Sequence, residues 1–117
     1  MEDSLTGIDR KVVAELRGMP ARDAANLFVK LVELFATNST ATLSQLQTAV
    51  QASDAGQAAA LCHKLKSAAG NVGAAAFARE LGRIERLCLE GDLARARDLL
   101  AGLQAAHPTL LAELARS

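Results

Sequence analysis

The sequence has no tryptophan, no tyrosine, three phenylalanines and two prolines. A β-sandwich needs aromatic and β-branched residues at alternating positions, and such residues are sparse along this chain. Alanine and leucine, by contrast, supply 25 and 19 of the 117 residues. They are the strongest helix formers, and few prolines or glycines interrupt them. The composition therefore predicts an all-α protein, and the length fits a single domain over residues 1–117.

An excess of charge of one sign is also lacking, because 13 Lys and Arg balance 13 Asp and Glu. A nucleic-acid-binding domain needs a basic surface, and so does a domain that binds anionic membranes, so neither class is favoured. No apolar run approaches the roughly 18 residues of a membrane span. The acidic start does not have the pattern of a secretion signal. A cytoplasmic location is therefore expected.

The two cysteines, Cys62 and Cys88, both fall in apolar helical stretches. Without a further pair no disulfide framework is expected, which agrees with a reducing compartment. Cys62 directly precedes His63, but adjacent helical residues point about 100° apart and no other ligand cluster follows. We therefore expect no metal site in this chain. Cys88 is interpreted as a small core residue.

Capping residues, glycine and proline divide the chain into predicted helices, which in chain order cover residues 8–17, 21–52, 54–70, 74–90 and 93 onward. Residues 37–40 are weak helix sequence, so the second helix is predicted to be kinked there, with two helices as the alternative. His107-Pro108 is expected to kink or end the last helix. Four amphipathic segments with short connections predict an antiparallel four-helix bundle, with the short N-terminal helix capping one end.

The second predicted helix carries an apolar stripe of four residues, Leu27, Leu31, Leu34 and Phe35. Phe28 and Phe77 are interpreted, like Phe35, as core residues, with contact to a partner as the alternative for one of them. His107 is interpreted as a histidine at a helix end rather than as a site of chemistry.

His63 is the residue that points to a function. At about 100° per residue, six apolar residues of the third helix share a core face: Ala58, Leu61, Cys62, Leu65, Ala69 and Val72. His63 lies well away from that face and is predicted to be exposed. Its neighbours three, four and seven residues away are Ala59, Ala60, Lys66, Ser67 and Gly70. All except Lys66 are small, so another protein can approach the imidazole closely.

A nucleophilic imidazole fits this setting. An unperturbed histidine has a pKa of about 6.5 and is largely neutral near pH 7. The ammonium of Lys66 disfavours an imidazolium and favours a phosphorylated ring. No carboxylate lies three or four residues away to hold the ring as in a catalytic triad, and no local oxyanion device is present. The site is therefore predicted to be an acceptor on which another protein's active site acts, and not an enzyme.

The segment His63-Lys-Leu-Lys-Ser67, followed by Gly70-Asn-Val-Gly73, resembles the motif of histidine-containing phosphotransfer (HPt) domains of two-component phosphorelays. The family pattern is His-x-Leu-Lys-Gly with a second glycine ten residues after the histidine, the position of Gly73. The alanine-rich lead-in and residues 81–85 also match, and the resemblance covers about residues 27–103. Ser67 departs from the pattern, because it stands where the family usually has glycine.

The resemblance implies that His63 accepts a phosphoryl group from an aspartyl phosphate of one receiver domain and passes it to another. Lys66 would steady the phosphoryl oxygens, and the receiver would supply Mg²⁺, so the chain itself needs no cofactor. The implied docking surface consists of Ala59, Ala60, Lys64, Ser67, Gly70 and Gly73. The Ser67 hydroxyl could bond the imidazole or the phosphoryl oxygens. A monomer is expected, because transfer needs the His63 face free.

Two other classes were compared with the phosphocarrier. A helical adaptor bundle would bind a partner without needing His63. The dimerisation helices of a histidine kinase typically show an acidic residue after the histidine and a proline soon afterwards, whereas here Lys64 follows and the next proline is Pro108. No Gly-rich ATP loop is present either. The sequence fits either a free protein or the end domain of a hybrid sensor kinase and leaves this choice open, with the end domain as the favoured expectation. The sequence leaves open the identity of the receivers and the direction of transfer.

Overall fold

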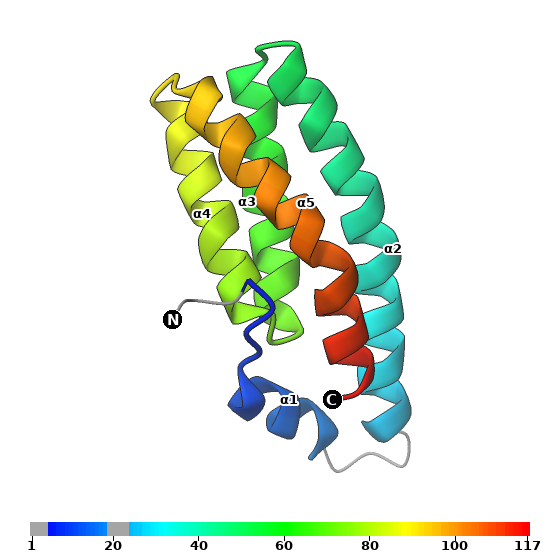
Figure 1. The fold of residues 1–117 in the computed structure, drawn as a ribbon. Helices are drawn as coiled ribbons and strands as arrows, with labels where there is room; N and C mark the ends of the chain where they lie inside the picture. The colour runs from blue at the N-terminus through cyan, green and yellow to red at the C-terminus, as the bar shows by residue number, and fades with distance from the viewer. Residues whose placement is uncertain (1–4, 19–23) are drawn as a thin grey trace.

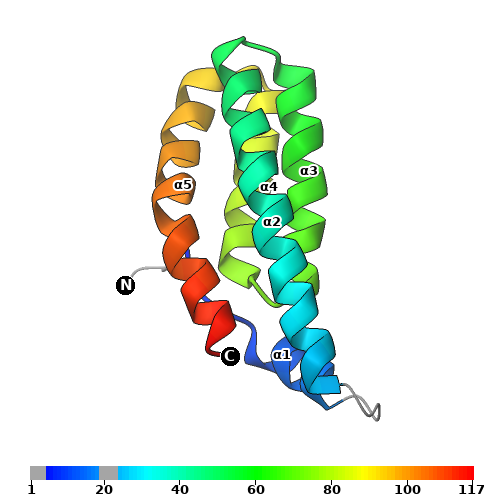
Figure 2. The ribbon, with the colours of Figure 1, turned by 90° about the vertical axis from the view of Figure 1, so that its right-hand side faces the viewer.

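The computed structural model describes residues 5–18 and 24–117, with side chains in the second segment described from residue 27 onward. The described helices are α1 (Arg10–Arg17), α2 (Ala24–Gln51), α3 (Ala55–Asn71), α4 (Ala75–Leu89) and α5 (Leu93–Ala115). Helices α2 to α5 run alternately up and down and pack side by side, as Figures 1 and 2 show. The predicted all-α, antiparallel four-helix bundle is confirmed.

Aspartates at the N-termini explain where three of the helices begin. Asp9, Asp54 and Asp92 are the N-cap residues of α1, α3 and α5. Each carboxylate accepts a hydrogen bond from a backbone N–H of the first turn, at 3.0–3.4 Å. Such a bond satisfies one of the donors that a helix start leaves without an intrahelical partner.

Helix α2 is continuous from Ala24 to Gln51, so the alternative of two separate helices is wrong. Thr37 and Thr40 fall inside it, and each hydroxyl donates a hydrogen bond to a carbonyl four residues earlier, at 3.2 and 2.8 Å. The polar side chains are thus satisfied within the helix and need not interrupt it. The predicted start of this helix at residues 21–23 lies outside the described residues.

The predicted apolar stripe of α2 is partly wrong. Phe35 is buried, but Leu27 is 36% exposed and Leu34 is 59% exposed. The face that packs on the core carries Phe28 and Val32 together with Phe35. These residues follow one another at steps of four and three, and Phe28 has more apolar surface to bury than Leu27, so the helix turns this face inward.

Helix α5 continues through Pro108 to Ala115, so the expectation that it ends at this proline is wrong. His107, interpreted as a helix-end residue, is instead buried inside the bundle. Its Nε2 lies 2.7 Å from Ser39 Oγ, and its ring centroid lies 5.9 Å from that of Phe77. Pro108 weakens α5, because proline lacks a backbone N–H donor. Packing around His107 compensates and keeps the helix continuous.

The three phenylalanines belong to the core, as predicted. Phe28, Phe35 and Phe77 are each at most 3% exposed. The rings of Phe35 and Phe77 meet edge to face, with centroids 6.3 Å apart and planes at 83°. This aromatic pair links α2 with α4 across the bundle.

Helix α1 closes one end of the bundle, as predicted (Figure 1). The backbone N–H of Asp9 donates to the carbonyl of Gly73 at 2.7 Å, which ties α1 to the turn between α3 and α4. Arg17 Nε donates to the carbonyl of Ser117 at 2.8 Å, and Arg10 donates to the Ser117 hydroxyl at 3.0 Å. The N- and C-terminal segments therefore hold each other. Within the described residues, no helix is apolar over a length sufficient to cross a membrane.

Candidate functional site

Helix α3 presents His63 to solvent. The side chain of His63 is 65% exposed. The six residues predicted to face the core are all at most 8% exposed: Ala58, Leu61, Cys62, Leu65, Ala69 and Val72. The helical-wheel prediction is confirmed in both respects, because the core face and the face of His63 point in different directions.

A carboxylate from the neighbouring helix supports the imidazole. Glu85 of α4 places Oε2 at 3.2 Å from His63 Nδ1 and Oε1 at 3.2 Å from Lys66 Nζ. The Glu85 side chain is 18% exposed, so it is partly shielded beneath the two residues that it contacts. When Nδ1 carries a proton and donates it to Glu85, the lone pair of the ring lies on Nε2. The contact therefore holds the exposed ring through Nδ1 and leaves Nε2 as its basic nitrogen.

Glu85 is the site residue that the sequence analysis missed. Residues 81–85 had been included in the resemblance, but no role was assigned to Glu85. A search for carboxylates three or four residues away tests one helix only, whereas this contact crosses from α3 to α4. The signal was the register of the hairpin: His63 and Glu85 lie equally far along the chain from Ala74, in the turn between the two helices.

Lys66 and Ser67 each have a partner within the domain. The ammonium of Lys66 is engaged by Glu85. The hydroxyl of Ser67 donates to the backbone carbonyl of His63 at 3.3 Å, so it bonds its own helix. Ser67 is exposed and small, and it keeps the approach to His63 open.

The residues predicted as a docking surface do not all lie on one accessible face. Ala60, Ser67 and Gly70 are exposed on the outer side of α3, as is Lys64 towards α2. Ala59 is only 5% exposed and belongs to the core. Including Ala59 in the docking surface was wrong, because at this point α3 turns its small residues towards its neighbouring helices.

Gly73 is also unsuited to direct contact with a partner. It is buried, it has φ +85°, and a Cβ added there would lie 3.1 Å from the carbonyl oxygen of Asp9. A left-handed backbone and a close approach of another backbone both favour glycine. The spacing of Gly73 from His63 therefore reflects the turn that ends α3 rather than a binding contact.

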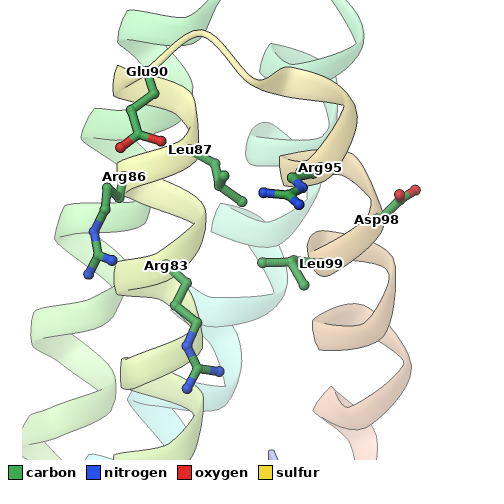
Figure 3. Close-up of a pocket in the computed structure, with 7 residues that line it drawn as sticks. All are labelled: Arg83, Arg86, Leu87, Glu90, Arg95, Asp98 and Leu99. Carbon is green, nitrogen blue, oxygen red and sulfur yellow. The ribbon is translucent and has the colours of Figure 1, made fainter.

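The described residues also form a groove apart from His63. A groove of about 540 Å³ opens between α4 and α5 (Figure 3). Its lining residues are Arg83, Arg86, Leu87, Glu90, Arg95, Asp98 and Leu99. Arg83 is already paired with Glu80 at 2.7 Å, and Arg95 lies 3.9 Å from Asp92. The exposed side chain of His63 therefore lies on the surface of the domain and not in this groove.

The cysteines are buried and free of disulfide bonds. Burial, with smaller contributions from Cys88 and Glu85, raises the pKa of Cys62 to about 12. Burial raises the pKa of Cys88 as well. Neither thiol is ionised near neutral pH, so neither is suited to nucleophilic attack. In the described part of the chain, no group of three or more His, Cys, Asp or Glu residues could hold a metal ion.

The site is thus an exposed histidine on a helical bundle, supported by a carboxylate of the neighbouring helix and lying outside the groove between α4 and α5. The family model of the Hpt domain matches residues 30–116. The chain belongs to the Hpt domain family, which confirms the resemblance seen in its sequence. Searches among curated proteins and among solved structures found no match.

Family membership establishes the biochemical role. The chain is a histidine phosphotransfer domain of phosphorelays in two-component signalling. It is a phosphoryl carrier rather than a catalytic enzyme, and its partners are receiver domains.

Proposed function

We propose that His63 is the phosphoacceptor of this domain. The observation that carries the proposal is the contact of Glu85 Oε2 with Nδ1 of an exposed imidazole, at 3.2 Å. Of the two histidines in the sequence, the other is His107, which is buried. A buried ring cannot reach the active site of a receiver domain, so the exposed ring is the acceptor.

The proposed step needs only the groups of the site and of the receiver. The lone pair on His63 Nε2 attacks phosphorus, the bond from phosphorus to the aspartyl oxygen of the receiver breaks, and the aspartate leaves as a carboxylate. The ring becomes cationic, because Nδ1 keeps its proton while Nε2 carries the phosphoryl group. Glu85 faces that proton and stabilises the charge as it develops. The reverse step returns the phosphoryl group to an aspartate of a second receiver.

Lys66 has two proposed roles. At rest its ammonium lies 3.2 Å from Glu85 Oε1, which fixes the carboxylate whose other oxygen holds His63. After transfer, the same ammonium can turn to the negatively charged phosphoryl oxygens. The lysine side chain is 38% exposed and flexible, so this movement requires no change of the backbone.

The proposed docking surface is the outer face of α3 around His63, formed by Ala60, Ser67 and Gly70, with Lys64 at its edge. Small side chains let a receiver bring its acidic site to the imidazole, and Lys64 attracts that acidic surface. The receiver is expected to supply Mg²⁺ for the transfer, and this chain contributes no cofactor. A monomer in the cytoplasm, where Hpt domains typically act, leaves this face free.

The decisive experiment is phosphoryl transfer from phosphorylated receiver domains of the same organism. We expect an acid-labile, base-stable adduct that mass spectrometry locates on His63. His63→Gln should remove it, while the matched variant His107→Gln, which alters the other histidine, should retain it wherever the domain stays folded. If a folded domain gains no label from any of these receivers, the proposal fails and a helical adaptor is favoured.

The role of Glu85 has its own test. Glu85→Ala removes the acceptor for Nδ1–H, so the neutral ring should shift towards the tautomer protonated on Nε2, which cannot attack. A hydrogen bond to a charged group contributes about 1.5–3 kcal/mol, so transfer should slow roughly ten- to a hundredfold. Glu85→Gln keeps an oxygen acceptor and should retain much of the rate. Long-range ¹H–¹⁵N NMR reports the tautomer, and an unchanged tautomer in Glu85→Ala would exclude this role.

A further inference from the structure

Gly82 stands inside α4, where glycine is a poor helix former. Four glycines lie within the described helices: Gly56, Gly70, Gly82 and Gly102. A Cβ added at any of the other three would meet nothing within 4 Å. At Gly82 it would meet Lys66, with Cδ at 3.5 Å and Nζ at 4.0 Å. Among these four, Gly82 is therefore the glycine at which an added Cβ would contact another side chain, that of Lys66.

This arrangement fixes the path of the Lys66 side chain. Its methylene groups pass across the backbone of α4 at Gly82, and its ammonium then reaches Glu85, about one helical turn further along. Lysine loses considerable rotamer freedom when it is held in one position. A flat surface at Gly82 favours the single conformation in which Nζ meets Glu85 Oε1 at 3.2 Å.

We propose that position 82 is a positioning site for phosphotransfer: a residue as small as Gly82 leaves open the path by which Lys66 reaches Glu85, and the paired Glu85 carboxylate holds the His63 ring with Nε2 free. The inference rests on the proposed role of His63. The inference adds a second point. Residue 82 of α4 would influence the reactivity of His63 on α3 without touching the imidazole ring or the phosphoryl group.

Side-chain size at position 82 should decide the effect. The contact of 3.5 Å between a Cβ and Lys66 Cδ is an ordinary van der Waals distance, so Gly82→Ala leaves Lys66 in place. The further carbons of leucine would occupy the path of Lys66 itself. In Gly82→Leu the lysine must turn into solvent, and Glu85 loses the cation that orients it.

The test compares Gly82→Leu with Gly82→Ala and with Gly102→Leu. Gly102→Leu makes the same exchange inside α5, where a Cβ would meet nothing within 4 Å. Leucine is a better helix former than glycine, so neither leucine variant should lose activity by unfolding. We expect Gly82→Leu to slow transfer to His63 about fivefold, the effect of losing a half-exposed ion pair, while the other two remain near the wild-type rate.

Two readouts separate this role from a simple obstruction of the receiver. The first is the His63 tautomer, read by ¹H–¹⁵N NMR in the isolated domain: Gly82→Leu should shift it in the direction of Glu85→Ala. The second is a double-mutant cycle with Lys66→Ala. Because both changes remove the same contact, the double variant should be no slower than Lys66→Ala alone.

The outcomes are distinct. An unchanged tautomer in Gly82→Leu, or a further slowing in the Lys66→Ala background, would overturn the inference and assign the effect to docking. Labelling of His63 in the wild-type domain, and its loss in His63→Gln, are measured in the same series. If label is found but not on His63, the proposed function itself fails. If His63 is labelled and Gly82→Leu transfers like the wild type, only the inference about Gly82 fails.

Discussion

In the interior of the bundle, Ser39 Oγ of α2 and His107 Nε2 of α5 lie 2.7 Å apart and share a hydrogen bond. Ser39 is completely buried and His107 is 8% exposed. Buried polar groups need partners, because an unsatisfied one forfeits its hydration without compensation. This pair thus satisfies two polar side chains and joins the first and last helices of the bundle.

Ser39→Ala should destabilise the domain. The substitution leaves the His107 ring buried without its hydroxyl partner, so we expect the free energy of unfolding to fall by about 1–3 kcal/mol. Chemical denaturation monitored by circular dichroism measures it. Ser44→Ala, at an exposed position of the same helix, is the control and should have little effect. Equal stabilities of the two variants would show that the hydrogen bond contributes nothing measurable.

The same residue should make stability depend on pH. Burial lowers the pKa of His107 below its ordinary value of 6.5. As pH falls below about 6.5, the unfolded chain binds a proton that the folded chain does not, so the unfolded state is favoured. The free energy of unfolding should therefore decrease on acidification, by at most about 1.4 kcal/mol per pH unit, until the folded pKa is reached.

The pH experiment is best made in the His63→Gln background, which removes the other histidine. Unperturbed Asp and Glu side chains titrate below about pH 4.5, outside the window from 5.5 to 7. Thermal unfolding across that window should show a midpoint that falls with decreasing pH. Introducing His107→Gln should flatten the slope. A slope that persists without His107 would refute its assignment to this residue.

The sequence predicted the bundle because its helix signals are local. Asp54 and Asp92 mark helix starts through hydrogen bonds to backbone groups in the first turn, and the apolar spacing of α3 separates His63 from the core. Local signals were misleading where tertiary packing decides. Pro108 weakens a helix in isolation, but burial of His107 and its neighbours carries α5 past it.

The candidate site was predictable only as far as one helix reaches. His63 and its exposure follow from the periodicity of α3. The contact with Glu85 depends on how α3 and α4 are aligned, and no spacing within one helix reports that alignment. The same limit explains the error at Ala59: it lies near His63 on the wheel, but whether this side of α3 is covered depends on the neighbouring helices.

Ser67, which replaces the glycine usual in the family, should be neutral for transfer. Its hydroxyl bonds the His63 carbonyl of its own helix and does not approach the imidazole. Ser67→Ala should therefore transfer at the wild-type rate. Ser67→Gly should do the same while lowering the free energy of unfolding by less than about 1 kcal/mol, through helix propensity alone. Rapid-quench transfer assays measure both rates, and a marked slowing in Ser67→Ala would place the hydroxyl on the reaction path.

Gly73→Ala should loosen α1 without altering the chemistry at His63. An L-residue at φ +85° costs about 1–2 kcal/mol, and its Cβ would also lie 3.1 Å from the Asp9 carbonyl oxygen. Gly91→Ala is the matched control, because Gly91 has φ +81° but a Cβ there would meet nothing within 4 Å. The backbone cost is common to both variants, so any additional loss in Gly73→Ala measures the contacts of the new Cβ with Asp9, Val12 and Val13.

Hydrogen exchange locates that loss. The Asp9 amide donates to the Gly73 carbonyl at 2.7 Å, so it should lose protection in Gly73→Ala and keep it in Gly91→Ala. Transfer to His63 should proceed at the wild-type rate in both variants under conditions where they are folded, because Gly73 lies beneath α1 rather than on the proposed docking surface. Slower transfer in Gly73→Ala alone, with the domain folded, would return Gly73 to the docking surface and would show that α1 contributes to the interface.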